Sequence, residues 1–215
     1  MRAARIGFLL LPLTMFLVGC NVFGAMVYYL SPRQMRDAEF ELARGRVAMV
    51  IECARPEEDN PVFARALAEE VNALFTQHKV PTRIIPFREL AALRRANPNY
   101  PSWSIQRIGR ELGAEQVLYA RLDTLRFRET PDHPILSPYA AMRLKVIGTN
   151  ELKNQARLWP DDAHGREVTC SRPPVEAVDY EVSDAEAAKL GRDAAQIVAR
   201  LFFRWDEEEM PQRER

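Results

Sequence analysis

The stretch 102–128, near the middle of the chain, constrains the fold most, because a short helix in it leads directly into a long strand. Ile105, Ile108 and Leu112 recur at the spacing of one helical face. Gly113 follows them, at the point where a helix commonly ends in a left-handed residue. The pattern therefore predicts a helix of about three turns that delivers the chain to a sheet.

The strand that follows this helix is expected to begin inside the protein and to end at its surface. Residues 117–120 are apolar without alternation, which is typical of a strand covered on both faces. Leu122 and Leu125 are an odd number of residues apart, so a regular strand cannot turn both toward the core. A β-bulge near Asp123–Thr124 would return Leu125 and Phe127 to the inside.

The remaining elements alternate between strand and helix at first and then form a run of strands. Strands are expected over 46–53, 82–85, 139–147 and 155–159, with a short edge strand over 167–171. Helices are expected after the Asn60–Pro61 cap, over 87–95, and after a capping box that starts at Ser183. The sequence thus predicts an α/β fold, a mixed sheet of about five strands with helices packed on it, in the order βαβαα-βββ-α.

The N-terminus carries a sorting signal. Arg2 and Arg5 precede the apolar run Ile6–Val18, which has the length of a signal-peptide core and ends in Leu17–Val18–Gly19–Cys20. This segment resembles the lipobox of bacterial lipoproteins. The resemblance implies cleavage before Cys20, lipidation of its thiol, acylation of its new amine, and sorting to the outer membrane, since Asn21 rather than aspartate follows.

A second interpretation of the same segment stays open. The chain continues apolar beyond Cys20, so Ile6–Leu30 could instead form one uncleaved helix that anchors the protein in the inner membrane. Both interpretations place the rest of the chain outside the cytoplasm. The expected organisation is a signal peptide over 1–19, a lipidated cysteine and tether over 20–45, a single periplasmic α/β domain over 46–205, and a flexible acidic tail over 206–215.

Charge excludes some partners and suggests others. Lysine and arginine together number 30, as do aspartate and glutamate, so no overall charge favours a nucleic acid. Arginines nevertheless gather in the middle of the chain, where they either contact an anionic partner or form a solvated, salt-bridged surface. Tyr100 and Trp103 form an aromatic loop there, which is either a contact site or a cap on the core. The candidate contact residues are Tyr100, Trp103, Arg107, Arg110, Arg121, Arg126 and Arg128.

Cysteine and histidine give no clear metal or redox site. If Cys20 is acylated, Cys53 and Cys170 remain as an even pair in an oxidising compartment, and both a disulfide and two unbonded core thiols are open. The three histidines lie far apart, with no pair at ligand spacing. Asp161, Asp162 and His164 are expected to form a solvated turn rather than an ion site.

No catalytic motif stands out. The chain has no glycine-rich phosphate loop and no serine in a nucleophile elbow. The carboxylates of Glu69 and Glu70 are adjacent on a helix and point in different directions. We therefore expect no cofactor and no enzymatic activity, with a cell-wall-active hydrolase as the alternative.

The element order and one near-motif resemble a known group of proteins. Together with the lipobox, the segment Glu111–Leu122 within Ile-Gly-Arg-Glu-Leu-Gly-Ala-Glu-Gln-Val-Leu-Tyr-Ala-Arg-Leu resembles an uncharacterised family of bacterial outer-membrane lipoproteins. The architecture over Arg46–Trp205 is similar to periplasmic domains of the curli-secretion-channel lipoproteins, the penicillin-binding-protein activator lipoproteins and the N-terminal domain of the Tol-system propeller protein.

That resemblance implies a role in binding. Those domains act by binding partners, so the resemblance implies a non-enzymatic binding or assembly factor whose partner is an envelope protein or peptidoglycan. The chain lacks the inserted hairpins with which the secretion channel spans the membrane, which argues against a pore. A subunit of an oligomeric export channel remains a further alternative, and the oligomeric state stays open.

Overall fold

The computed structural model describes residues 35–130, 133–152, 155–176 and 184–206. The described residues belong to two compact units, which are taken separately. In the smaller unit, β1 (Met35–Arg36) pairs antiparallel with β10 (Trp205–Asp206), and the Arg36 guanidinium lies 6.0 Å from the centre of the Trp205 ring. Cys20 and the segment Ile6–Leu30 lie outside the described residues. None of the helices in the described part of the chain is both long enough and apolar enough to cross a membrane.

The larger unit begins at Asp37, which is earlier than the sequence suggested. Residues 37–45 were assigned to the tether, but Leu42 is buried and the ring of Phe40 lies 6.2 Å from that of Trp159. The backbone N–H of Glu39 also donates to the Leu201 carbonyl oxygen at 2.8 Å. This segment is therefore part of the folded domain.

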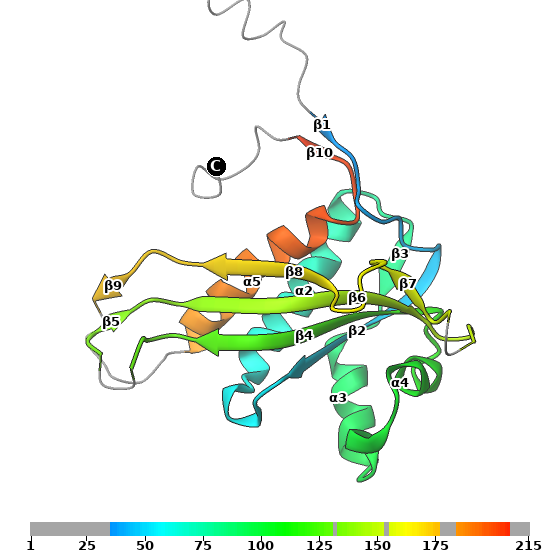
Figure 1. Ribbon diagram of the computed structural model, residues 1–215, viewed down its shortest axis with the longest axis horizontal. Helices are drawn as coiled ribbons and strands as arrows, with labels where there is room; N and C mark the ends of the chain where they lie inside the picture. Colours follow the sequence, from blue (N-terminus) through cyan, green and yellow to red (C-terminus); the bar gives the residue numbers. More distant parts are fainter. Residues whose placement is uncertain (1–34, 131–132, 153–154, 177–183, 207–215) are drawn as a thin grey trace, which may run out of the picture. The chain divides into compact units, whose positions relative to one another are not determined.

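A mixed sheet forms the centre of the larger unit, as predicted (Figure 1). Its strands are β2 (Gly45–Cys53), β3 (Thr82–Ile84), β4 (Gln116–Arg126), β6 (Tyr139–Gly148), β7 (Arg157–Trp159) and β8 (Arg166–Ser171). The order is β3-β2-β4-β6, with β7 and β8 both pairing with β6. β3, β2 and β4 are parallel, and every pairing from β4 onward is antiparallel. A separate pair joins β5 (Ile135–Leu136) to β9 (Val175–Glu176).

Two of the helices, α2 (Pro61–Gln77) and α4 (Ile105–Glu111), begin at caps that the sequence offers. The described residues also form α3 (Phe87–Ala96) and α5 (Asp184–Arg200), with 3-10 turns η1 (Pro56–Glu58) and η2 (Tyr100–Ser102). The Asn60 side chain accepts hydrogen bonds from the N–H groups of Val62 and Phe63, which caps α2 as predicted. Ser104 caps α4, and Gly113 has the left-handed conformation (φ +64°) expected after it. Ser183 lies outside the described residues.

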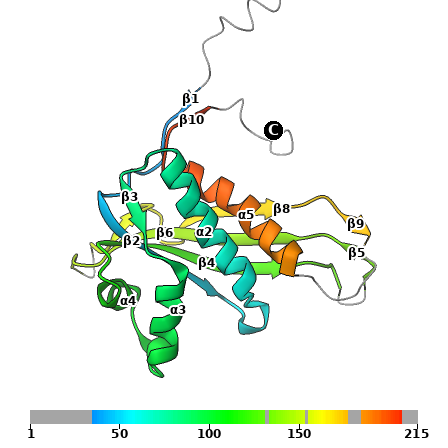
Figure 2. The same ribbon diagram turned by 180° about the vertical axis from the view of Figure 1, so that it is seen from behind.

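Two helices cover one face of the sheet. Figure 2 shows α2 and α5 packed side by side across the strands. Gly191 of α5 lies directly against α2, since a Cβ atom added there would sit 2.7 Å from the Phe63 carbonyl oxygen. Leu67, Val71 and Leu190 are fully buried in this layer. The close approach of the two helices thus depends on a residue without a side chain.

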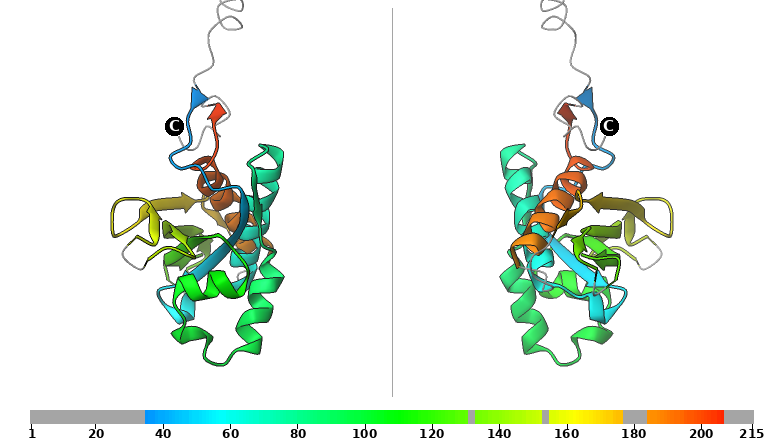
Figure 3. Two further views of the ribbon diagram at one scale, coloured as in Figure 1. Left: turned by 90° about the vertical axis from the view of Figure 1, so that its right-hand side faces the viewer. Right: turned by 90° about the vertical axis from the view of Figure 1, so that its left-hand side faces the viewer.

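The other face of the sheet is covered only in part. Ile108 and Leu112 of the α4 segment and Leu90 of α3 form one buried cluster with Val50 and Val117. These contacts lie on β2 and at the start of β4, and no helix lies over the rest of β4, β6 and β8 in the described residues (Figures 1 and 3). We call the uncovered part the open face.

The bulge in β4 is confirmed. The pairing of β4 with β6 shifts register between Leu122 and Thr124, so that Asp123 is the extra residue. Leu122 and Leu125 are consequently both buried, with 2% and 5% of their surface exposed. Phe127, however, is only half-buried.

Candidate functional site

The open face is lined by alternate residues of three strands. On β6, Ala140, Met142, Leu144 and Val146 are buried, whereas the residues between them are half-exposed. Arg143 and Lys145 therefore point outward, as the alternation over 139–147 predicts. The open face carries Tyr119, Arg121, Asp123 and Arg126 of β4, Tyr139, Ala141, Arg143 and Lys145 of β6, and Glu167, Thr169 and Ser171 of β8.

Two arginines lie directly opposite each other at the centre of the open face. Arg121 of β4 is paired in register with Arg143 of β6, and their side chains are 52% and 39% exposed. Like charges at such a position destabilise a sheet unless an anion lies between them. Asp123 supplies that anion, with its two carboxylate oxygens each 3.1 Å from one arginine Nε.

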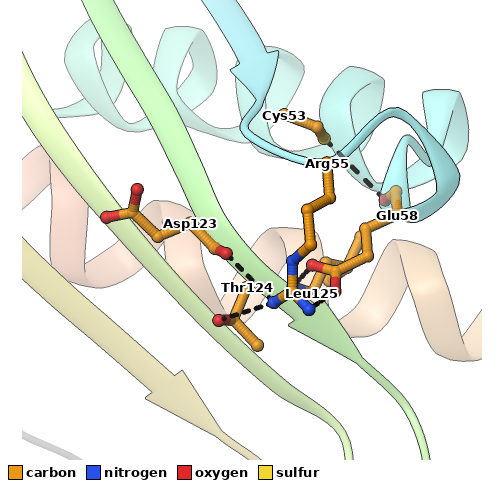
Figure 4. A network of polar contacts seen from close by, with 6 residues as sticks. All are labelled: Cys53, Arg55, Glu58, Asp123, Thr124 and Leu125. Atoms are coloured by element: carbon orange, nitrogen blue, oxygen red, sulfur yellow. Dashed lines mark hydrogen bonds and ion pairs between the residues drawn. The ribbon is translucent and has the colours of Figure 1, made fainter.

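The bulge that positions Asp123 is held by a clamp from the neighbouring loop. Figure 4 shows Arg55 and Glu58 reaching from the η1 segment to β4. The Glu58 carboxylate accepts the Leu125 N–H at 2.8 Å and also pairs with Arg55 at 2.8 Å. Arg55 in turn donates to the Asp123 carbonyl oxygen and to Thr124 Oγ1, both at 3.3 Å. The clamp therefore binds three consecutive residues of the bulged strand.

The seven predicted contact residues do not form one surface. Arg121 and Arg126 lie on the open face, where the Arg126 guanidinium stands 5.1 Å from the centre of the Tyr139 ring. Arg128 is buried and donates to the His133 carbonyl oxygen. The other four belong to η2, α4 and the segment between them.

The η2–α4 group is mainly structural. Tyr100 is 7% exposed and belongs to the buried cluster under α3 and α4, so it is a cap on the core. The Trp103 ring packs against the same cluster and carries the Arg107 guanidinium 4.1 Å from its centre. Arg110 donates to the Thr149 carbonyl oxygen at 2.8 Å, which ties α4 to the end of β6. Of this group, Arg107 and Arg110 are exposed and Trp103 is half-exposed.

Burial raises the pKa of two tyrosines, Tyr119 at the edge of the open face and Tyr100 in the cluster under α3 and α4. Burial, followed by the charge of Glu52, raises the pKa of Tyr119 to about 12, and its hydroxyl donates to Glu52 at 3.1 Å. Burial likewise raises the pKa of Tyr100. Both phenols stay protonated at physiological pH, so each is a hydrogen-bond donor and not a base.

The predicted disulfide alternative is wrong. Cys53 is on β2 and Cys170 is on β8, with β4 and β6 between the two strands. Three strand spacings amount to about 14 Å, whereas a disulfide needs Cα atoms within about 7 Å. The two residues therefore do not form a disulfide with each other. The positions of Cys53 and Cys170 in the sequence did not indicate how many strands separate them in the sheet.

Cys53 is not activated as a nucleophile. Its Sγ lies 3.8 Å from the Glu58 carbonyl oxygen (Figure 4). Asp59 Oδ1 lies 3.7 Å from the same sulfur. Burial, and then the negative charge of Asp59, raise the pKa of the thiol to about 11. A reactive cysteine needs the opposite shift, because the thiolate is the nucleophile.

A cavity of about 410 Å³ lies beside the open face, against the β7–β8 loop. Arg143, Asp162, His164 and Glu167 contribute to its wall. Asp162 accepts the His164 N–H at 2.8 Å, which forms the turn that the sequence predicts. No group of three or more histidine, cysteine or carboxylate side chains in the described residues is placed to hold a metal ion.

The sequence missed part of the site. It did not single out Arg143 and Lys145 as contacts, although alternation already turned them outward. The clamp residues Arg55 and Glu58 gave no local signal, because their partners on β4 are more than 60 positions further along the chain.

Comparison with known proteins assigns no family to this chain. No protein-family model and no curated protein matches the chain. Similar solved structures include a PelC dodecamer from Paraburkholderia phytofirmans, at 16% identity and a TM-score of 0.39, covering 80% of this chain and 99% of that one. Lipoprotein GNA1162 from Neisseria meningitidis is 10% identical, with a TM-score of 0.40 and coverages of 73% and 99%. The LpoB C-terminal domain from Salmonella enterica is 14% identical, with a TM-score of 0.33 and coverages of 65% and 88%. At these values the likeness assigns no function to this chain.

Proposed function

We propose that this chain is a lipoprotein, attached to the periplasmic face of the outer membrane through acyl chains on Cys20. The lipobox-like Leu17–Cys20 segment behind Arg2 and Arg5 supports this proposal. Two or more acyl chains on one residue give durable attachment, whereas a single chain gives only marginal membrane binding. The α/β domain then works in the envelope as a non-enzymatic binding or assembly factor.

The open face carries the binding role. It is an uncovered sheet surface whose centre holds two like-charged side chains, Arg121 and Arg143, in direct register. The two arginines share the carboxylate of Asp123, so the pair is tolerated in the sheet and still presents partly exposed guanidinium groups to an anion of a partner. The clamp of Arg55 and Glu58 keeps this arrangement rigid before any partner arrives.

Neither the thiol of Cys53 on β2 nor the phenol of Tyr119 on β4 is activated for catalysis. The thiol of Cys53 and the phenol of Tyr119 both have raised pKa values, at about 11 and about 12. These shifts hold both groups in the protonated form, which is not nucleophilic. A cell-wall hydrolase would need an activated group, and the release of fragments from peptidoglycan by the purified chain would contradict a purely binding role.

Lipidation of Cys20 is tested by replacing its sulfur atom with oxygen. The Cys20→Ser variant is expressed in bacteria supplied with a labelled fatty acid, and the wild-type chain is the control. Label in the wild type and none in the variant is the expected result. An unlabelled wild-type chain that still fractionates with membranes would instead favour the inner-membrane signal anchor over Ile6–Leu30.

The binding role is tested by crosslinking in intact cells. A photoreactive amino acid at Thr169 reports on the open face, and one at Ala73 on α2 is the matched control, because both positions are exposed. We expect a specific adduct from Thr169 and none from Ala73. Adducts from Ala73 alone would move the partner surface to the helices and refute the assignment of the open face.

A further inference from the structure

Four basic side chains form a strip along two neighbouring strands of the open face. This basic strip consists of Arg121 and Arg126 on β4 and Arg143 and Lys145 on β6. From Lys145 to Tyr139, which pairs with Arg126, the strip spans six residue-to-residue steps along β6, or about 20 Å. Its length and flatness suit an elongated ligand better than a small one.

The basic strip holds more positive charge than its neighbours neutralise. Three carboxylates lie beside these four cations: Asp123 on β4, Glu167 in register with Arg143, and Glu52 of β2 in register with Arg121, so one positive charge is left over. Asp123 meets each of Arg121 and Arg143 at its Nε atom. Both arginine side chains are partly exposed, so a second anion can approach their terminal nitrogens from solvent.

Asp123 also indicates which anion the arginine pair accepts. Its planar carboxylate lies between the two guanidinium groups with both contacts at 3.1 Å. Carboxylates match the flat, forked donors of arginine. A ligand carboxylate approaching from solvent would meet the same kind of donor on the outer side of the pair.

The side chains around the strip favour a polymer of sugars over a membrane or a protein. The exposed large apolar residues of the described chain are Met35, Leu152 and Val175, and none of them lies on the open face. A membrane surface or a protein interface needs apolar anchors at the contact. The strip instead ends in half-exposed Tyr119 and Tyr139, whose rings combine an apolar face with a polar tip.

We propose that the basic strip binds a linear glycan that carries carboxylate groups. This inference rests on the proposed function and specifies the ligand of the open face. The carboxylates pair with the terminal guanidinium nitrogens of Arg121 and Arg143 and with Lys145, while the sugar rings lie along the strands between the two tyrosines.

Binding is measured with the full-length chain in neutral detergent and immobilised polygalacturonate as the probe. The test variant is Arg121→Gln with Arg143→Gln. The matched control is Arg65→Gln with Arg192→Gln, which removes the same charge from exposed positions on α2 and α5. We expect the test variant to lose at least about tenfold in affinity and the control to stay within about twofold. Unchanged melting temperatures show that both variants fold.

Several outcomes would overturn the inference. Equal losses in the test variant and the control would show that only net charge matters. A wild-type chain that binds soluble dihexanoyl phosphatidylglycerol but not polygalacturonate would point to a lipid headgroup. If polygalacturonate does not bind while the Thr169 adduct still forms in cells, the assignment of the ligand as an acidic glycan is wrong and the proposed function stands. If the Thr169 adduct does not form either, the proposed function itself is contradicted.

Discussion

Replacing Glu58 with alanine should weaken the domain more than an ordinary surface substitution does. The Glu58 side chain is 17% exposed and accepts the N–H of Leu125, a residue that is itself 5% exposed. Truncation leaves that buried N–H without an acceptor, which costs about 1–3 kcal/mol. The accompanying loss of the pair with Arg55, whose side chain is 51% exposed, adds less than about 1 kcal/mol.

The Glu58→Gln variant separates these two contributions. A glutamine carbonyl oxygen can still accept the Leu125 N–H, so this variant loses the charge but keeps the buried hydrogen bond. We therefore expect Glu58→Gln to lower the free energy of unfolding by less than about 1 kcal/mol, well under the effect of alanine.

Urea denaturation of the full-length chain and both variants measures these differences. The urea concentration at the midpoint of unfolding should fall, while the slope of the unfolding free energy against urea concentration stays constant. A constant slope shows that stability and not compactness has changed. Equal destabilisation by alanine and glutamine would refute the claim that the buried N–H dominates. A loss below about 0.5 kcal/mol for alanine would refute the clamp itself.

Two further predictions concern the helix layer and the thiol. Gly191→Ala should lower the free energy of unfolding by about 1–3 kcal/mol, because the new Cβ would sit 2.7 Å from the Phe63 carbonyl oxygen. Thermal denaturation measures this loss of stability. An unchanged melting temperature would contradict the close packing of α2 and α5. Cys53 should react slowly with iodoacetamide in a Cys20→Ser, Cys170→Ser background, since a pKa of about 11 leaves about one thiolate per thousand at pH 8. The rate should rise about tenfold per pH unit up to pH 10, and a plateau near pH 9 would show that the pKa is not raised.

Periodicity was sufficient for most of the fold. The helical spacing of Ile105, Ile108 and Leu112 and the alternation over 139–147 are local signals, and both elements occur where they were expected. The odd spacing of Leu122 and Leu125 even located the bulge. Each of these features depends on neighbours within one element, which a sequence displays directly.

The candidate site was harder to predict because it depends on which strands become neighbours. The direct opposition of Arg121 and Arg143 follows from the register of β4 against β6, which the bulge shifts. The open face exists because α3 and α4 cover only β2 and the start of β4, and no residue pattern reports how far a helix layer extends. The pairing of Cys53 and Cys170 was also undecided from the sequence, because the sequence does not reveal the order of the strands in the sheet.

The connections of β4 also determine the order in which the sheet can assemble. β4 reaches β6 through the short segment between Arg126 and Tyr139, but it reaches its parallel neighbour β2 only after the long segment between Cys53 and Gln116 closes. By loop-closure entropy the second step costs about 1.5 kcal/mol more than the first. We therefore expect amide protons of β4 and β6 to gain protection before those of β2 in pulsed hydrogen exchange, so that the arginine pair forms early and the parallel half of the sheet is added to it.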